Sequence, residues 1–529
     1  MKWNNIDTCK SFYRLKDSKK ISLKEVLKPN FAEKRIKNYE CKISNTLKYN
    51  YATKQVNEEI IEIFQNLAYE QELIKKYQAL LLGEIINISE NRKVQHHFTR
   101  NLSAINKDNF YLAELEKIKS FVEQIHNKKI LSSSNKPFTN VVQIGIGGSD
   151  LGPKSLYIAL KEYAKTTNNI KMIAHFISNI DPEDAVSSLS KIPEENTLFI
   201  IASKSGTTQE TLANERLIIK YLHLKGIKEP KKNIVVVTSN SSPLAKDNSY
   251  LSHFYMDDFI GGRYSSTSVC GGLVLSLAFG NNTFQNLLQG AEEADKNALN
   301  ENIKENATLM DALICVYERS ILGYHATAIL PYAKALSHFV AHLQQLDMES
   351  SGKSVNINSK PISYNTGSIV FGEPGTNGQH SFYQFLHQSN EIIPMQFIAF
   401  KESSLSYGLP KTKNSNILET DYINTIKEHH QYLLANLIAQ IYAFAIGKED
   451  KNKNKHFEGE RPSSLIYGEK LDAHSLGALL AHFENKVMFQ GFLWNINSFD
   501  QEGAKLGKQI KIEDSNEILK TYSMLLFNK

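Results

Sequence analysis

One short segment gathers many hydrogen-bond donors. Ser203-Lys-Ser-Gly-Thr-Thr208 holds four hydroxyl groups and one ammonium group within six residues. Such donors bind a dianionic phosphate, above all where the free N–H groups of a helix N-terminus join them. The segment is therefore a candidate phosphate-binding loop. Its alternative is an ordinary Ser/Thr helix cap beside a solvated lysine.

A second loop is rich in glycine. The stretch Gln143-Ile-Gly-Ile-Gly-Gly-Ser-Asp150 ends an apolar run, and its glycines let backbone N–H groups approach an anion closely. It is not a GxGxxG loop, because Asp150 stands where the third glycine would be, and it lacks the GK[ST] ending of a P-loop. A tight turn without a ligand is the alternative. Two such loops in neighbouring units favour a phosphosugar site.

A parallel sheet would bring these two loops together. Short β-branched runs recur about every 25 to 35 residues, the spacing that right-handed βαβ units require. We expect strands at 141–146, 172–177, 198–202, 234–238 and 253–256. Open α/β sheets bind ligands at the carboxyl ends of their strands, which is where both loops fall.

The helix after the donor-rich loop can be followed residue by residue. Its apolar positions approximate a 3.6-residue period, and Gly226 is placed to end it. Thr207 and Glu210 have the spacing of a capping box at its start. The pattern therefore predicts that the 203–208 loop lies at a helix N-terminus.

A second alternating region follows, with expected strands at 326–330, 368–371, 396–400 and 464–466. A long helical pattern, which runs from Ile423 to Ile441, lies between the last two. The first hundred residues look helical and lack strand alternation. Residues 448–462 are polar and rich in Lys and Asn, which predicts an exposed loop. We expect an α/β protein with two similar domains, each a parallel sheet flanked by helices.

Six motifs in order make the chain resemble the glucose-6-phosphate isomerase family. They are IGIGGSDLGP from Ile144, ASKSGTTQET from Ala202, GGRYSSTS from Gly261, LDMESSGK from Leu346, GEPGTNGQHSFYQFLHQ from Gly372 and INSFDQEGAKLGK from Ile496. The resemblance implies two flavodoxin-like SIS domains. We expect an N-terminal helical region (1–105) packed on the second domain, SIS domains at 106–285 and 286–510, and a C-terminal helical tail (511–529).

The resemblance also implies which residues bind and react. The substrate phosphate would be held by Gly148, Ser149, Ser203, Lys204, Ser205 and Thr208. The reaction would interconvert glucose 6-phosphate and fructose 6-phosphate, in glycolysis and gluconeogenesis, through ring opening and a cis-enediolate. Glu349 would move the proton, and Arg263, beside Gly262, would stabilise the enediolate. From the residues alone, Glu349 could be a surface carboxylate, and Arg263 could pair with Asp257 or Asp258.

Ring opening needs an acid and a base, which the resemblance assigns to His380 and Lys508. It further implies a homodimer in which His380 comes from the partner subunit. Gln501, a substrate-binding residue in this reading, is seven residues before Lys508, so a helix would place both on one face. The family's usual residues are replaced at Glu502, Ala504 and Lys505, which we expect to face solvent or an interface.

Composition limits the other classes of function. The 529 residues carry 61 basic and 56 acidic side chains without a long basic run, so no nucleic-acid partner is expected. The N-terminus lacks an apolar signal region, and no apolar run approaches a membrane span, which favours a cytoplasmic protein. The four cysteines and the histidines show no metal-ligand spacing, so neither metal nor cofactor is expected.

Two other functions remain open at this point. A dual-specificity phosphoglucose/phosphomannose isomerase would share every motif. A non-catalytic SIS-type phosphosugar sensor would keep the phosphate loops but would not need Glu349, Arg263, His380 and Lys508 together. The presence of all four favours the enzyme.

Overall fold

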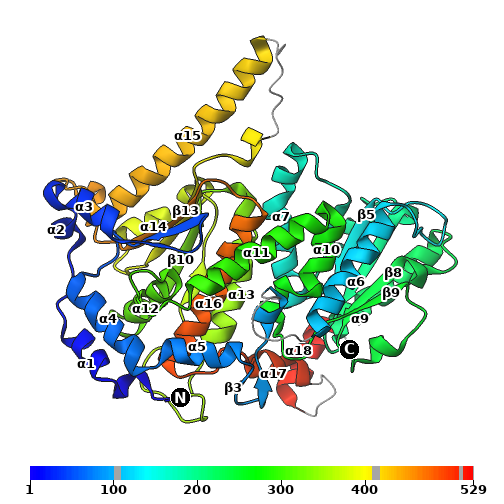
Figure 1. Cartoon of the computed structure of the whole chain (residues 1–529), viewed down its shortest axis with the longest axis horizontal. Helices are drawn as coiled ribbons and strands as arrows, with labels where there is room; N and C mark the ends of the chain where they lie inside the picture. The colour runs from blue at the N-terminus through cyan, green and yellow to red at the C-terminus, as the bar shows by residue number, and fades with distance from the viewer. Residues whose placement is uncertain (101–108, 408–416, 511–515, 528–529) are drawn as a thin grey trace.

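The computed structural model describes residues 1–100, 109–407, 417–510 and 516–527. Two sheets lie side by side, each covered by helices (Figure 1). Long helix α15 (Ile417–Ile446) projects away from this body. No helix in the described part of the chain is both long and apolar enough to span a membrane.

The first sheet has five parallel strands in the order β6-β5-β7-β8-β9. They are β5 (Asn140–Ile144), β6 (Ile173–Ile177), β7 (Thr197–Ala202), β8 (Ile234–Thr238) and β9 (Ser252–Tyr255). All five were predicted, with ends that differ by at most two residues. Continuous apolar runs such as Val141 and Val142 are typical of strands buried on both faces.

Helices cover both faces of this sheet. On one face, side chains of α8 (Pro182–Leu189) and α9 (Gln209–Leu224) pack against Ile144 and Phe199. On the other lie α6 (Asn109–His126), α7 (Leu151–Thr166) and α10 (Val269–Phe279). Helix α9 ends before Gly226, whose φ of +85° is a conformation that glycine adopts without strain, so the predicted stop is confirmed.

The second sheet has six strands in the order β1-β2-β13-β12-β10-β11. The four predicted strands are β10 (Ala326–Pro331), β11 (Ile369–Phe371), β12 (Met395–Phe400) and β13 (Ser463–Gly468), all parallel. One face packs on α14 (Tyr383–Gln388) and α15, and the other packs on the helices of the central core.

Two predictions made from local pattern were wrong. The first hundred residues are not wholly helical. Strand β2 (Leu47–Asn50) extends the second sheet antiparallel to β13, β1 (Glu40–Lys42) pairs antiparallel with β2, and β3 (Ile85–Asn87) pairs with β4 (Arg92–Lys93). The helices there are α1 (Lys10–Asp17), α2 (Leu23–Val26), α3 (Pro29–Asn38), α4 (Glu58–Glu70) and α5 (Leu73–Leu81). The capping box at Thr207 and Glu210 is also absent, since Thr208 is the N-cap and its side chain makes no capping hydrogen bond.

Helix α16 (Ala473–Trp494) is the centre of the molecule and is buried over almost its whole length. It packs against α11 (Asn281–Asn297), α12 (Ala307–Ser320) and α13 (Phe339–Ser351). Because polar groups in such a core need partners, Lys486 of α16 pairs with Asp311 of α12 at 3.0 Å. The last two helices, α17 (Glu502–Gln509) and α18 (Glu517–Phe527), follow α16.

Candidate active site

Both predicted phosphate loops lie at the carboxyl edge of the first sheet. A 3₁₀ turn, Gly147–Ser149, follows β5, and the 203–208 loop follows β7, the adjacent parallel strand. The Ser203 hydroxyl donates to Thr208 Oγ1 at 3.0 Å, and Thr207 N donates to Ser205 Oγ at 3.2 Å. The loop runs directly into α9, so the predicted helix N-terminus is confirmed. Hydroxyl and N–H donors therefore gather at one edge.

The Lys204 ammonium is occupied within the protein. Its Nζ donates to the carbonyl oxygens of Asp258 at 3.2 Å and Ile260 at 2.9 Å. Burial and the nearby charge of Arg92 lower its pKa. Lys204 thus fastens the phosphate loop to the segment that leads to Arg263.

Gly148 lets the separate loops touch. A Cβ atom placed on Gly148 would lie 2.1 Å from the carbonyl carbon of Gly262. No side chain fits at that distance, so the turn after β5 and the turn that carries Arg263 (Gly262–Thr267) can meet only with glycine here. This contact sets the position of Arg263 relative to the phosphate loops.

Arg263 is fully buried and joins three segments of the chain. Its Nε donates to Ser350 Oγ at 2.6 Å, and its Nη1 donates to Gln501 Oε1 at 3.0 Å. Its Nη2 donates to the carbonyl oxygens of Ser498 at 2.6 Å and Asp500 at 3.0 Å. Because all these partners are neutral, the guanidinium keeps its positive charge available. The pairing with Asp257 or Asp258 that the sequence left open is not what the structure has.

Glu349 is the acidic group beside this cation. Its Oε2 lies 3.5 Å from Arg263 Nη1, and its side chain is 22% exposed, whereas that of Arg263 is 0% exposed. Helix α13 thus brings the carboxylate of Glu349 and the hydroxyl of the next residue, Ser350, to the same guanidinium. A carboxylate that is both partly accessible and next to a fixed cation can exchange a proton with a bound molecule.

Gln501 and Lys508 lie at the two ends of α17. The helix predicted from their spacing is confirmed, with Gln501 at its N-cap position. Glu502 and Ala504 are exposed, as expected, whereas the side chains of Lys505 and Lys508 lie outside the described residues. The structure therefore joins Gln501 to Arg263 and gives the backbone position of Lys508.

His380 stands apart from the group around Arg263. It ends a 3₁₀ turn, Asn377–His380, after β11 of the second sheet, and its side chain is exposed. Within the described chain, no hydrogen bond or ion pair links it to Arg263 or Glu349. The preceding residue is held firmly, because Gln379 Nε2 donates to Tyr332 Oη at 2.8 Å and also to Asn436.

A cavity of about 200 Å³ connects several of these groups. Lys204, Gly261 and Gln501 line it, together with Arg92 and Lys93 of strand β4. The sequence did not indicate these two cations, because a lone pair of basic residues does not show which residues lie near it in the fold. It also missed Ser350, although that residue stands inside a matched motif, and Gln345, one helical turn before Glu349, whose Nε2 would lie 3.2 Å from a Cβ on Gly147.

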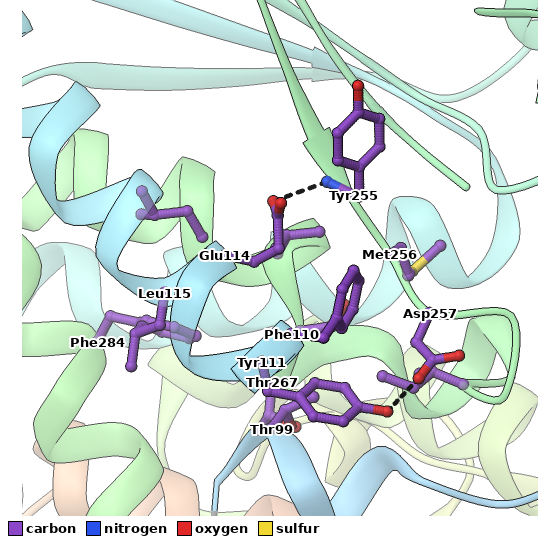
Figure 2. Close-up of a pocket in the computed structure, with 14 residues that line it drawn as sticks. Thr99, Phe110, Tyr111, Glu114, Leu115, Tyr255, Met256, Asp257, Thr267 and Phe284 are labelled. Carbon is purple, nitrogen blue, oxygen red and sulfur yellow. Dashed lines mark hydrogen bonds between the residues drawn. The ribbon is translucent and has the colours of Figure 1, made fainter. Parts of the chain in front are cut away.

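A second, much smaller cavity of about 30 Å³ is lined by helix α6 and by the segment 255–260 (Figure 2). Tyr111 donates to the carboxylate of Asp257, and Tyr255 N donates to Glu114 Oε2 at 2.8 Å. Both contacts tie helix α6 to the segment that leads to Arg263. The space suits a water molecule and is too small for a sugar phosphate.

The described residues do not form a metal-binding cluster. Among them, no group of three or more His, Cys, Asp or Glu side chains is arranged to hold a metal ion.

Comparison with known proteins places this geometry in a family. The phosphoglucose isomerase family model matches residues 50–524. The glucose-6-phosphate isomerase of Treponema denticola is 55% identical over 99% of this chain and 100% of its own length, and that of Borreliella burgdorferi is 50% identical over 96% of each. The crystal structure of a glucose-6-phosphate isomerase from Chlamydia trachomatis superposes with a TM-score of 0.88 at 37% identity and covers 99% of both chains. The predicted resemblance and α/β fold class are confirmed, and this chain belongs to the phosphoglucose isomerase family.

Proposed function

We propose that this chain interconverts glucose 6-phosphate and fructose 6-phosphate, the isomerase activity for which its relatives are named. The observation that carries the proposal is the Arg263–Glu349 pair, with its 3.5 Å separation, at the edge where both phosphate loops end. A base and a fixed cation side by side are what a proton transfer next to a carbonyl requires.

In this proposal Glu349 takes the proton from C2 of the open-chain aldose and returns it to C1. The negative charge that develops on the oxygens of the enediolate lies next to Arg263, whose position is set by its neutral partners. Because the guanidinium is already oriented, little reorganisation accompanies the reaction. Gln501, bonded to Arg263, would contact the sugar.

The substrate phosphate would be held at the other end of the site. Gly148, Ser149, Ser203, Ser205 and Thr208 supply N–H and hydroxyl donors at the start of α7 and α9. Lys204 would contribute through its backbone and the field of its charge, because its ammonium binds two carbonyl oxygens. Gly262, whose carbonyl carbon would lie 2.1 Å from a Cβ on Gly148, would contribute to substrate binding beside the glycine-rich loop.

His380 and Lys508 would open the sugar ring, with His380 supplied by the second subunit of a homodimer. The exposed side chain of His380 and its place outside the Arg263 group support this arrangement. Gln379, fixed by Tyr332, would hold the histidine in position for the partner's site. We further propose that the enzyme needs no metal and works in the cytoplasm, and that residues 106–285 and 286–510 form its two domains.

The test is a coupled assay of fructose 6-phosphate conversion with the purified chain in the presence of a chelator. Turnover that the chelator leaves unchanged supports the proposal. Inactivity that added metal restores would contradict it and favour a metal-dependent isomerase. Mannose 6-phosphate, assayed in parallel, would reveal dual specificity, and binding of either ester without turnover would indicate a sensor.

A further inference from the structure

The two sheets share one strand order around their first strand. In the first sheet, β5 has β6 on one side and β7, then β8, on the other. In the second sheet, β10 has β11 on one side and β12, then β13, on the other. The chain therefore reverses direction across the sheet between β5 and β7, and again between β10 and β12. Such switch points form crevices at the carboxyl ends of the strands, where α/β proteins bind ligands.

The first switch point carries the phosphate loops already described. At the second, a cavity of about 310 Å³ is present. Lys334 and Ala335, which follow β10, line it together with Glu402, Ser403 and Ser404, which follow β12. Its place in the second sheet is thus the same as that of the 203–208 loop in the first.

The lining of this switch-point pocket has two parts. Its floor is apolar and includes Phe400, Leu433 and Leu471. Its polar lining, the rim, consists of Lys334, Glu402, Ser403 and Ser404 together with Glu162, Tyr332 and His430. An apolar floor with a few polar groups, at this volume, is typical of pockets for small molecules.

Two of the rim charges have not been neutralised by neighbours. In the ranges that the structure covers, neither Lys334 nor Glu402 makes a side-chain hydrogen bond or ion pair. The adjacent Lys401, by contrast, is paired with Glu469 at 3.0 Å, and Glu162 is paired with Lys165 at 2.6 Å. Among the described residues, the unpaired charges of the rim are therefore the ammonium of Lys334 and the carboxylate of Glu402.

These groups match one class of ligand. An ammonium and two hydroxyls suit a phosphate, a carboxylate accepts hydrogen bonds from sugar hydroxyls, and an apolar floor suits the C–H face of a sugar ring. We propose that the switch-point pocket of the second sheet binds a second molecule of sugar phosphate.

This pocket is separate from the candidate active site. Helix α7 begins at Leu151, directly after the glycine-rich loop that follows β5. It ends at Thr166, whose hydroxyl donates to the carbonyl oxygen of Ser404 at 3.2 Å. At 1.5 Å per residue, its 16 residues span about 24 Å. Both sites can therefore be filled at once, and the proposal does not depend on the isomerase reaction.

The experiment is equilibrium dialysis with radiolabelled fructose 6-phosphate, because interconversion of the two hexose phosphates leaves the count of bound label unchanged. The wild-type chain should bind two equivalents per chain. Lys334→Glu should weaken the second equivalent at least about tenfold, since it reverses the charge of the only lysine or arginine among the lining residues. Unphosphorylated glucose should not fill the pocket.

Lys427→Glu is the matched control, because this exposed lysine lies on α15 outside the lining. It should bind two equivalents, and both variants should keep wild-type turnover. Ala335→Leu, which narrows the pocket without a charge change, serves if Lys334→Glu does not fold. A single equivalent in the wild type that Lys334→Glu leaves unchanged overturns the proposal, as do two equivalents that neither pocket variant reduces. A pocket covered by a second copy would bind one equivalent, with a change of sedimentation in Lys334→Glu, and would overturn it too.

Discussion

Arg263 Nη1 lies 3.5 Å from Glu349 Oε2, and the residue next to Glu349, Ser350, accepts a hydrogen bond from Arg263 Nε at 2.6 Å. Two consecutive residues of α13 thus touch opposite sides of one guanidinium. The cation is positioned by the same helix that positions the carboxylate, so a shift of α13 would move both together. This coupling makes the pair suited to one reaction geometry.

Replacing Glu349 with glutamine tests the base directly. Glu349→Gln keeps nearly the same shape but cannot accept the substrate proton, so kcat should fall by about 10²- to 10⁴-fold or more. Binding of fructose 6-phosphate, measured by calorimetry, should persist. Met348→Leu, at an exposed position on the same helix, is the control and should keep its activity. Near-normal turnover of Glu349→Gln would remove this carboxylate from the mechanism.

The contacts of Arg263 predict that even its replacement by lysine lowers the activity. Arg263→Lys keeps the charge but cannot reach Ser350, Gln501 and two carbonyl oxygens at once, so kcat should fall by roughly 10²-fold. Ser350→Ala removes one of these contacts and should cost about 1 to 2 kcal/mol of stability. Steady-state kinetics and urea unfolding of both variants separate the two effects. A lysine variant with full kcat would show that charge alone suffices.

Mixing two inactive variants tests whether His380 acts across a dimer. Glu349→Gln and His380→Ala should each be nearly inactive alone. After denaturation and refolding as an equal mixture, half of the dimers are mixed and one of their two sites is intact, so about a quarter of wild-type activity should return. If His380 acted within its own chain, no activity would return.

The buried ion pair of the core should matter for stability. Asp311 Oδ2 contacts Lys486 Nζ at 3.0 Å, His482 Nε2 at 3.1 Å and Gln396 Nε2 at 2.8 Å. Lys486→Met leaves the carboxylate without its cation and should cost about 3 to 5 kcal/mol in urea unfolding. The double variant Lys486→Met/Asp311→Asn should recover part of that loss. A double variant whose loss equals the sum of the losses of the two single variants would mean that the two residues act independently.

Asp150, at the end of the glycine-rich loop that follows β5, should make the stability of the protein depend on pH. Burial raises its pKa from 3.8 to about 6, although Lys154 and Ser178 oppose the shift. Between these values the folded state binds more protons than the unfolded state, so the stability contributed by this group falls as pH rises. The full cost is present above the folded pKa.

The variant Asp150→Asn cannot titrate and should escape this cost. Its stability relative to the wild type should therefore increase by roughly 1 kcal/mol between about pH 5 and pH 8, since one pKa unit corresponds to about 1.4 kcal/mol. Thermal unfolding of both proteins at these two pH values measures the difference. A difference that stays constant with pH would show that the Asp150 carboxyl is not perturbed in the folded state.

The central parallel strands of both sheets were predictable because they are buried on both faces. A strand such as β7 is a continuous apolar run, and that signal is contained in the segment itself. Strands β1 and β2 were missed for the opposite reason. Each has only a few residues, and they form because β2 pairs with β13, which lies more than four hundred residues away. Short edge strands of this kind depend on a partner that no local pattern reveals.

Some features of the candidate site could likewise be predicted from the sequence, and others could not. The donor-rich loop before α9, the glycine loop after β5 and the identity of the family followed from residue types and order. The role of Lys204 did not, because a lysine in a loop can reach either a ligand or a carbonyl oxygen, and its neighbours at Asp258 and Ile260 are more than fifty residues away. The same holds for Arg92, whose closeness to Lys204 needs the β3–β4 hairpin.

By itself, the sequence determined the parallel α/β sheets, the loops at their carboxyl edges and the membership of the phosphoglucose isomerase family, since these depend on short segments and their order. Only the tertiary structure decided that Arg263 is buried among Ser350, Gln501 and two carbonyl oxygens, and that Glu349 stands beside it while His380 does not. The physical reason is that hydrogen bonds and burial at this point join residues from three distant parts of the chain, and their distances are set by how α13, α16 and the two sheets pack together.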